Sequence, residues 1–360
     1  NNIAVQGFGF VGAANAVNIA LSNIGLKKVI CFEKKNERTK IIFSKAKKGI
    51  FPHSTNDEYL KNKFKKLVLD EKIKFTFDKT DYRYAKTIII SINFDLKNYK
   101  ESKKNFIKSF KDIINFIQDD TLIIVESTVP PGFCERELKP ILINIKKKKK
   151  FSKLFLAHSF ERVMPGKDYL NSCRNNYRVY SGIDKISSKA CKGFLKKIIN
   201  INKFPLTHLE NTTSSETCKI IENSYRAVNI AFVDEWMKFC KNFNLNLFEI
   251  INAIKKRPTH NNIMYPGIGV GGYCLTKDAV FGKISNNLYL KKKRNKFPLS
   301  TISIKINNQM INNSYNLILE KFGKKIKNKK ILIIGMSYKN DVGDLRDSPS
   351  LSLAKKLEKQ

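Results

Sequence analysis

Short apolar runs alternate with helical patterns over about the first 200 residues. The apolar runs are Ile3–Val5, Val29–Phe32, Thr87–Ile92 and Leu122–Val125, with helical stretches such as Asn105–Ile117 between them. Strands that alternate with helices usually pair in parallel through right-handed crossovers. The pattern therefore predicts an N-terminal α/β domain with a doubly wound parallel sheet.

The pattern changes at Asn211. Thr213–Glu216 has the sequence of a capping box, and neither Gly nor Pro occurs from there to about Phe243. This predicts a helix of about 30 residues and about 45 Å, longer than one small domain needs. Such a helix would bridge two domains or pair with a copy of itself. Four of its apolar residues suggest that it is substantially buried: Ile220, Tyr225, Val228 and Phe232.

The rest of the chain is more irregular. A shorter helix is expected at Leu247–Ile254, followed by a glycine-rich loop from Arg257 to Cys274. Lys330–Gly335 has the pattern of the first strand of another α/β unit, and the residues from Ser348 that of its helix. One strand and one helix cannot bury a sheet, so we expect a fragment that stops inside this unit. The chain opens on Asn1 instead of methionine, so we also expect a trimmed front.

The charge balance raises, and then weakens, the case for a polyanionic partner. There are 68 Lys+Arg against 31 Asp+Glu, a net charge of +37. Only ten of the 68 are Arg, the residue preferred for bidentate phosphate and base recognition. The Lys are scattered in short runs, such as that at 146–150, which are typical of solvated surfaces. We therefore expect no specific nucleic acid and no membrane as partner.

Cysteine and histidine usage favours a reducing compartment. The seven Cys include no CxxC pair, and the four His are isolated from one another, so neither a disulfide framework nor a metal site is indicated. Residues 1–26 carry no charge, but polar residues interrupt them and a basic start is lacking. That argues against a signal peptide or a spanning helix. We expect a cytoplasmic protein.

A glycine fingerprint follows the first predicted strand. Gly7, Gly9 and Gly12 form GxGxxG, a helical pattern follows through Ala16, Ile19 and Ala20, and Glu33 ends the next strand. The expected cofactor-binding residues are Gly7, Gly9, Phe10, Val11, Gly12 and Glu33. Such glycines let the backbone turn, approach a pyrophosphate and pack a helix, whose N-terminus stabilises the negative charge. Glu33 would accept ribose hydroxyls and repel a 2′-phosphate. The pattern favours a Rossmann-like domain that binds NAD instead of NADP. FAD, or a glycine turn without ligand, remains an alternative.

One face of the long helix carries residues that could take part in catalysis. Glu216, Lys219, Asn223 and Arg226 recur on one face of the long helix. Lys219 could stabilise a developing alkoxide and Asn223 could hold a water or a substrate oxygen, although a solvated stripe is an equal alternative.

Cys274 gives the sharpest signal for a nucleophile. Four glycines between positions 267 and 272 would let a bulky substrate reach its sulfur, and Lys277 and Asp278 follow it. A cationic neighbour favours the reactive thiolate. The other six cysteines lack this glycine approach and are expected to be small core residues: Cys31, Cys134, Cys173, Cys191, Cys218 and Cys240.

Six blocks, in order, resemble the UDP-glucose/GDP-mannose dehydrogenase family, the nucleotide-sugar 6-dehydrogenases. They are Gly7–Gly12, Glu126–Gly132, Ser159–Gly166, Glu216–Phe232, Pro266–Asp278 and Gly335–Pro349. The resemblance implies three domains. They are a Rossmann-like NAD-binding domain at 1–203, a central helical dimerisation and catalytic domain at 204–300, and a linker helix with the start of a nucleotide-sugar-binding domain at 301–360. Phe160, Ala279 and Ser91–Phe94 depart from the family's usual residues.

The resemblance also implies a reaction and its residues. A sugar C6 alcohol would be oxidised to a carboxylate with two NAD and no released aldehyde, to supply surface polysaccharide precursors. Cys274 would form a thiohemiacetal and then a thioester, with Lys219 and Asn223 as the oxyanion-stabilising pair. Asp278 with Thr128 would hold the hydrolytic water, and Glu161 would act as acid and base.

Substrate contacts and partners follow from the same resemblance. The substrate-binding residues would be Lys219, Asn223, Gly271, Lys339 and Arg346. A UDP-hexose or UDP-N-acetylhexosamine is favoured over GDP-mannose, and a homodimer is expected. Arg257 and His260 stay unassigned.

Two other functions stay open. A simpler 3-hydroxyacid or 6-phosphogluconate type dehydrogenase would share the layout and the Lys-x-x-x-Asn pair, but it has no role for Cys274. A basic, non-catalytic binding protein on the same scaffold would be expected to have lost the catalytic groups, all of which are present.

Overall fold

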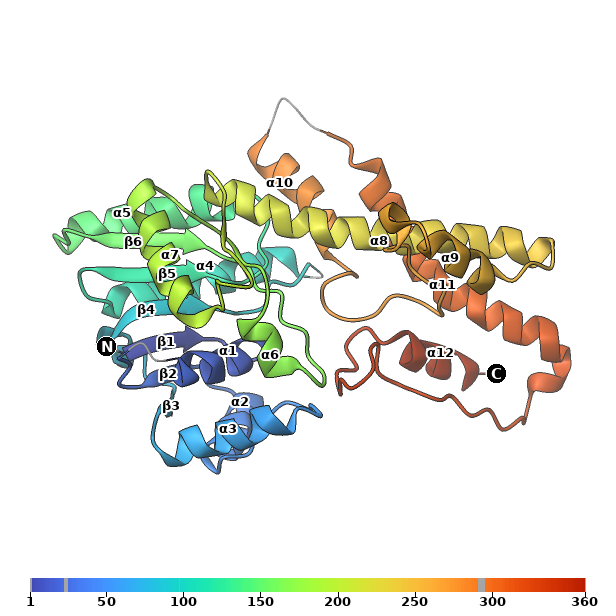
Figure 1. Ribbon diagram of the computed structural model, residues 1–360, viewed down its shortest axis with the longest axis horizontal. Helices are drawn as coiled ribbons and strands as arrows, with labels where there is room; N and C mark the ends of the chain where they lie inside the picture. The colour runs from blue at the N-terminus through green and yellow to red at the C-terminus, as the bar shows by residue number, and fades with distance from the viewer. Residues whose placement is uncertain (1, 23–24, 97, 291–294, 360) are drawn as a thin grey trace. The chain divides into compact units, whose positions relative to one another are not determined.

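A computed structural model of the chain describes residues 2–22, 25–96, 98–290 and 295–359 (Figure 1). It forms two compact units, Asn1–Lys219 and Ile220–Gln360. The division into three domains stays a prediction. Within the described ranges, no helix is both long enough and apolar enough to cross a membrane.

The first unit is built on one eight-stranded sheet with the order β3-β2-β1-β4-β5-β6-β7-β8. All of its pairs are parallel except β6–β7, so the predicted doubly wound sheet is confirmed, with one antiparallel pair that the pattern did not predict. The strands are β1 (Asn2–Gln6), β2 (Val29–Phe32), β3 (Ile73–Thr76), β4 (Ala85–Ile90), β5 (Thr121–Val125), β6 (Leu154–His158), β7 (Val179–Gly182) and β8 (Thr207–His208).

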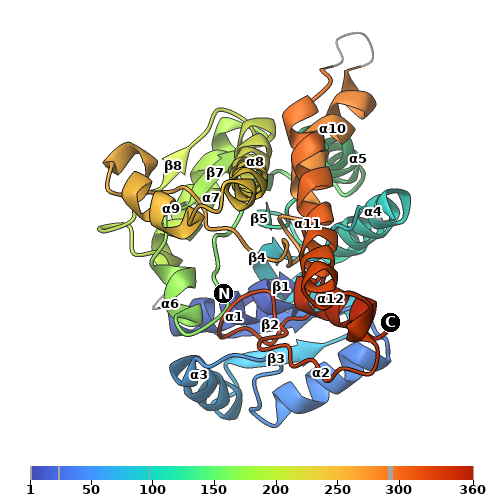
Figure 2. The same ribbon diagram turned by 90° about the vertical axis from the view of Figure 1, so that its right-hand side faces the viewer.

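Helices cover both faces of this sheet (Figure 2). One face carries α1 (Phe10–Leu21), α2 (Glu37–Lys47), α3 (Glu58–Leu69), α6 (Tyr169–Arg174) and α7 (Lys185–Ile198). The other carries the 3-10 turn η1 (Lys79–Tyr84), α4 (Tyr99–Phe116), the π-helical turn η2 (Cys134–Leu138) and α5 (Lys139–Lys148). Because both faces are covered, β2 and β5 are buried along their whole length, as apolar runs in parallel sheets usually are.

The second unit is helical. Its helices are α8 (Thr212–Asn242), which begins in the first unit, α9 (Leu247–Lys255), α10 (Phe281–Tyr289), α11 (Pro298–Phe322) and α12 (Pro349–Leu357), with 3-10 turns η3 (Pro258–His260), η4 (Asp278–Val280) and η5 (Gly323–Ile326). Within this unit α8 and α11 run in the same direction. Asn307 donates to the Ala227 carbonyl at 3.0 Å, and about four turns further along both helices Lys241 pairs with Glu320 at 2.5 Å.

The long helix was predicted correctly, but its start was not. Residues 212–242 are helical. The side-chain oxygen of Asn211, and not the predicted capping box, accepts the Ser214 N–H at 2.9 Å. Glu216 cannot close the box because its carboxylate binds backbone groups elsewhere in the first unit.

The predicted burial of this helix is confirmed only in part. Ile220 is buried and Val228 is half-buried, but Tyr225 and Phe232 are 52% and 51% exposed. Of the polar face, Arg226 is exposed, whereas Glu216, Lys219 and Asn223 are buried. These three polar side chains can be buried because each has a hydrogen-bonding partner outside its own helix.

The strand predicted at Lys330–Gly335 is also wrong. These residues belong to none of the described strands, and Leu332 and Ile334 are 84% and 90% exposed. A strand needs a neighbour for its backbone groups, and local apolar pattern cannot supply one. The helix predicted from Ser348 is confirmed as α12, and the Ser348 side chain caps it.

Candidate functional site

A side chain at each of the three fingerprint glycines would meet different surroundings. Gly7 has φ +98°, and a Cβ there would lie 2.6 Å from the Ser91 carbonyl oxygen. A Cβ on Gly12 would lie 1.8 Å from the Gly7 oxygen, so the helix could not pack on the turn. A Cβ on Gly9 would meet nothing within 4 Å.

The space beside Gly9 opens onto the start of α1. Gly9 is the N-cap of this helix and no side chain caps it; Phe10 and Val11 form its first turn. A helix N-terminus favours an anion. The open turn and the uncapped helix together fit the pyrophosphate of a dinucleotide.

Glu33 follows β2 directly and closes the other side of this turn. One carboxylate oxygen accepts the Phe8 N–H at 2.6 Å and the other accepts the Lys34 N–H at 3.2 Å. Burial raises the pKa of Glu33, while the two N–H groups and Arg38 oppose that rise. Each oxygen can accept further hydrogen bonds, so the carboxylate can also accept those of a ribose. The residues present therefore fit NAD.

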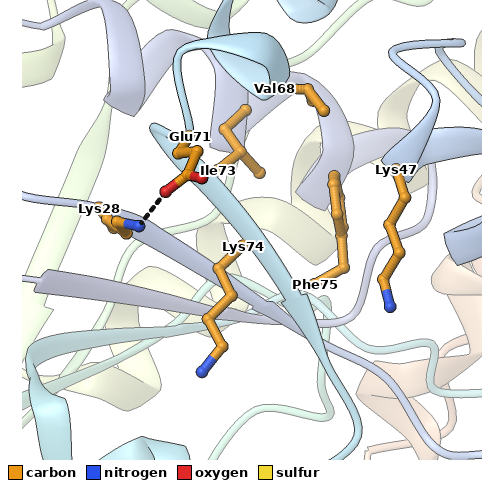
Figure 3. Close-up of a pocket in the computed structure, with 7 residues that line it drawn as sticks. All are labelled: Lys28, Lys47, Val68, Glu71, Ile73, Lys74 and Phe75. Carbon is orange, nitrogen blue, oxygen red and sulfur yellow. Dashed lines mark hydrogen bonds and ion pairs between the residues drawn. The ribbon is translucent and has the colours of Figure 1, made fainter.

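A pocket of about 260 Å³ lies elsewhere on the first unit (Figure 3). It is lined by Lys28, Lys47, Val68, Glu71, Ile73, Lys74 and Phe75. Lys28 precedes β2, and Glu71 and Ile73 lie at the start of β3. Since open parallel sheets bind ligands at the carboxyl ends of their strands, this pocket is at the wrong end for the cofactor.

Lys219 and Glu161 come together in the first unit. The Lys219 ammonium donates to the Glu161 carbonyl oxygen at 2.9 Å and lies 5.2 Å from the centre of the Phe160 ring. Burial raises the pKa of the Glu161 carboxyl, which the Lys219 charge opposes and the Glu126 charge reinforces. A carboxyl with a raised pKa suits acid and base work near neutral pH. Thr128 lies half-buried in the loop after β5.

Glu216 is a site residue that the sequence did not single out for this role. Its carboxylate accepts the Gly132 N–H at 2.6 Å and the Cys134 N–H at 2.9 Å. Burial raises its pKa to about 7. It thereby fastens α8, three residues before Lys219, to the segment that follows Thr128. In the sequence it was a residue of the predicted capping box, of the polar stripe and of a matching block, and none of these indicated that it binds the segment after β5.

In the second unit, Asn223, Asp278 and Lys277 form a buried network. The Asn223 amide donates to one oxygen of Asp278 at 2.7 Å, and the Lys277 ammonium pairs with the other at 2.6 Å. Lys277 also lies 4.4 and 4.7 Å from the ring centres of Tyr273 and Phe281. The cation expected to favour the thiolate is therefore bound to Asp278.

Cys274 belongs to the same turn as Asp278. Its carbonyl oxygen accepts the N–H groups of Lys277 at 3.2 Å and Asp278 at 2.9 Å. Cys274 is exposed, whereas the other six cysteines are buried or, for Cys218, half-buried. The prediction that these six are core residues while Cys274 is accessible is confirmed for five of them, and Cys218 is intermediate.

Side chains from a later segment of the chain pack against the glycine-rich loop. A Cβ on Gly271 would lie 2.5 Å from the Tyr338 Cβ, and one on Gly272 would lie 2.7 Å from the Tyr338 ring. Gly269 faces Pro349 in the same way, at 2.9 Å. The expected room for a substrate is filled at these three positions, and only at Gly267 is the space open.

Arg346 and Lys339 lie on the segment that packs against this loop. The Arg346 carbonyl accepts the Gly272 N–H at 3.2 Å, and its guanidinium pairs with Asp344 at 2.6 Å. Lys339 is exposed. The second unit thus brings Gly271 and Arg346 together with the turn of Cys274. Sequence reasoning missed Tyr338, which was only one letter of a matching block.

Two parts of the family match this chain. The NAD binding domain of the UDP-glucose/GDP-mannose dehydrogenase family matches residues 1–199, and the family's central domain matches residues 213–308. A UDP-N-acetyl-D-mannosamine dehydrogenase of Methanococcus aeolicus is 30% identical over 360 residues, covering 98% of this chain and 75% of the relative.

Solved structures agree with this match. A UDP-D-ManNAc dehydrogenase from Pyrococcus horikoshii superposes with a TM-score of 0.85 at 25% identity, over 100% of this chain and 81% of that one. A 3-hydroxyisobutyrate dehydrogenase from Mycobacterium tuberculosis shares the fold, with a TM-score of 0.57 at 13% identity over 87% of this chain and 94% of that one. Fold alone does not separate the two kinds of dehydrogenase, but the domain matches do. The chain belongs to the UDP-glucose/GDP-mannose dehydrogenase family and is an NAD-dependent nucleotide-sugar dehydrogenase.

Proposed function

We propose that the protein oxidises the C6 alcohol of UDP-N-acetyl-D-mannosamine to the uronic acid, in two steps at one site. The substrate proposal is supported by the relatives, which carry that activity in their names and match nearly the whole chain. The two-step proposal is carried by one observation, the exposed Cys274 whose own turn ends in the buried Asp278–Asn223–Lys277 network. A single hydride transfer needs no such nucleophile.

The proposed reaction consists of two oxidations and one hydrolysis. The alcohol loses a hydride and a proton to give the aldehyde, and the Cys274 sulfur adds to its carbon to form a thiohemiacetal. Loss of a second hydride from that carbon gives a thioester, and attack by water breaks the C–S bond and restores the thiol. When bound at the Gly7–Gly12 turn, NAD supplies the hydride acceptor in both oxidations. One alcohol, two NAD⁺ and one water give one carboxylate, two NADH and three protons.

Lys219 and Asn223 are proposed to stabilise the oxyanions. They lie four residues apart on α8 and so share one face of that helix. Lys219 is aimed by its bond to the Glu161 carbonyl, and the Asn223 amide is oriented by Asp278. Donors that are already oriented stabilise developing charge without reorganising during the reaction.

The hydrolysis of the thioester is assigned to three further residues. Asp278 and Thr128 hold the attacking water, and Glu161 takes its proton. The raised pKa of Glu161 makes this carboxyl a stronger base than an ordinary glutamate. We also propose that Gly271, Lys339 and Arg346 contact the nucleotide sugar, with the Arg346 guanidinium exchanging its partner Asp344 for a phosphate.

The stoichiometry tests the two-step proposal directly. The yield of NADH per sugar is measured with UDP-N-acetylmannosamine, UDP-N-acetylglucosamine, UDP-glucose and GDP-mannose. Two NADH and a carboxylate are expected from the first of these. A ratio of one with an aldehyde as product would overturn the thioester mechanism, and faster turnover of another sugar would overturn the substrate assignment.

The nucleophile is tested by Cys274→Ser. Acid formation should be lost, because the serine hydroxyl is almost entirely un-ionised at neutral pH and so is a poorer nucleophile than the thiol, and an ester hydrolyses less readily than a thioester. Cys218→Ser serves as the matched control, since this half-buried cysteine on α8 has no place in the mechanism. Normal acid formation by the Cys274→Ser enzyme would show that the assignment is wrong.

We further propose that two copies associate along α8. Phe232, Trp236, Phe239 and Phe243 are each at least 44% exposed and form a ladder of ring contacts along one side of this helix. Exposed apolar surface of this kind marks interaction sites. Sedimentation should show a dimer that Trp236→Lys converts to a monomer, and a monomeric parent protein would defeat the proposal.

A further inference from the structure

A buried ion pair joins β7 to the end of β5. A terminal nitrogen of Arg178, in the residue just before β7, lies 2.6 Å from a carboxylate oxygen of Glu126, directly after β5. The two residues are only 4% and 3% exposed. Neither residue has a part in the mechanism above. A buried pair is costly to desolvate, so its presence is weak evidence for stability.

Glu126 binds the elements that form the cofactor turn. Its second oxygen accepts the Asn15 amide of α1 at 2.7 Å and the Ser91 hydroxyl, just past β4, at 2.6 Å. Ser91 is also the residue whose carbonyl excludes a side chain from Gly7. One carboxylate therefore ties α1 and the end of β4 to the end of β5.

Arg178 also reaches the segment that carries Glu161. The nitrogen that pairs with Glu126 donates to the Ser159 carbonyl at 3.3 Å, and the Ser159 hydroxyl donates to the Val179 carbonyl at 2.9 Å. Two residues later the Glu161 carbonyl accepts the Lys219 ammonium. The segment is thus held at one end by Arg178 and at the other by Lys219.

We propose that Arg178 is a positioning residue for Glu161 and, through Glu126, links the acid/base residue to the cofactor-binding turn. This inference rests on the role proposed above for Glu161. Arg178 and Glu126 need not touch the substrate. They act by fixing the backbone before Glu161 and by placing one charge of each sign beside its carboxyl.

The electrostatic surroundings of Glu161 give this role a distinctive signature. Facing it are Lys219 from α8, Glu126 after β5, Arg178 before β7, and the buried Cys173 of α6. Burial lowers the pKa of the neighbouring His158 to about 3, so that ring is neutral. The Glu126 charge raises the pKa of Glu161 and the Arg178 charge lowers it. Loss of Glu126 alone should therefore lower this pKa, and loss of both should restore it.

The test is the pH profile of acid formation by the complete protein with saturating NAD and nucleotide sugar. Glu126→Gln, which keeps an acceptor for Asn15 and Ser91, should move the Glu161 limb to lower pH, because it removes the negative charge that raises the pKa of Glu161. The double variant Glu126→Gln with Arg178→Met should bring the limb back toward its parental position. Arg162→Gln is the matched control, because this neighbouring guanidinium binds the Tyr177 carbonyl on the exposed side.

A purely structural role predicts a different result. Both variants would then lose melting temperature and kcat while the limb stayed in place, and that outcome overturns the inference. The inference is also overturned if the Glu161 limb of the double variant lies as far from its parental position as the limb of Glu126→Gln. If the double variant does not fold, the position of the Glu161 limb in the pH profile of Glu126→Gln alone tests the inference. A parent protein that makes no acid refutes the proposed function, whereas two NADH per sugar with an unmoved limb refutes only the role of Arg178.

Discussion

The substitution Glu216→Gln tests how α8 is fastened to the first unit. The parent carboxylate accepts two backbone N–H groups, one on each oxygen. At pH 5 the parent carboxyl is protonated, because its pKa is about 7; its carbonyl oxygen still accepts one N–H, and its hydroxyl oxygen keeps lone pairs for the other. The glutamine can accept only one of them, because an amide NH₂ group is not an acceptor. Leaving one buried N–H without an acceptor costs about 1–3 kcal/mol. We therefore expect the variant to be less stable than the parent at pH 5.

The difference should shrink as the pH rises. The pKa of Glu216 is about 7 in the folded protein, raised by burial from an ordinary value of 4.5. A folded pKa above the unfolded one means that the contribution is greatest below pH 4.5 and is lost as the pH rises through 7. Between pH 5 and pH 8 this linkage removes about 2–3 kcal/mol from the unfolding free energy of the parent. Glutamine does not titrate, so the variant escapes that loss.

Urea unfolding followed by circular dichroism at pH 5, 6, 7 and 8 measures both curves. The expected result is a gap that closes, or reverses, between pH 5 and pH 8, with equal m-values. Glu210→Gln, which removes an exposed carboxylate just before α8, is the control for the loss of one charge. A gap that stays constant or widens with pH would refute the account of Glu216 as a buried carboxyl whose ionisation opposes folding.

Three glycine substitutions test the packing of the two sites. Gly12→Ala should abolish NAD binding and destabilise the first unit, because its Cβ would lie 1.8 Å from the Gly7 oxygen; NAD titration and thermal melting measure both. Gly9→Ala should keep the fold, since its Cβ meets no atom, yet weaken NAD binding at least tenfold by filling the space for the pyrophosphate; unchanged affinity would contradict the assignment. Gly272→Ala should displace the Tyr338 ring, which would lie 2.7 Å from the new Cβ, and lower kcat without changing the affinity for NAD.

The parts of the fold that could be predicted are those whose signal is local. The strand before Gly7, the turn itself and Glu33 at the end of β2 follow from apolar runs and glycine spacing, and all are found where expected. Lys330–Gly335 shows the limit of this signal. Its apolar pattern is as strong as that of β2, but a strand exists only where another strand satisfies its backbone, and none of the described strands does so.

The site was predictable in its residue types but not in its contacts. The glycines before Cys274 were read as space for a substrate, whereas the side chains of Tyr338 and Pro349 occupy that space. Lys277 was expected to act on the thiol, but it is bound to Asp278. Tyr338 and Pro349 are far away in the chain, where spacing carries no information. Asp278 is adjacent to Lys277, but spacing cannot tell whether the ammonium pairs with this carboxylate or with the thiol.

The long helix α8 shows why this limit matters for function. An apolar face normally turns inward, and by that rule Tyr225 and Phe232 would be buried and Lys219 solvated. Lys219 is buried and Tyr225 and Phe232 are exposed, because three polar side chains of α8 have partners that only the tertiary fold provides: backbone N–H groups at Gly132 and Cys134, the Glu161 carbonyl and the Asp278 carboxylate. Burial without such partners would cost several kcal/mol for each charged group. The buried polar side chains of α8 are thus available for chemistry, and its exposed aromatic side chains for association. This is why we propose that the reaction takes place beside Lys219 and Asn223 and that a second copy of the chain packs on the exposed aromatic residues.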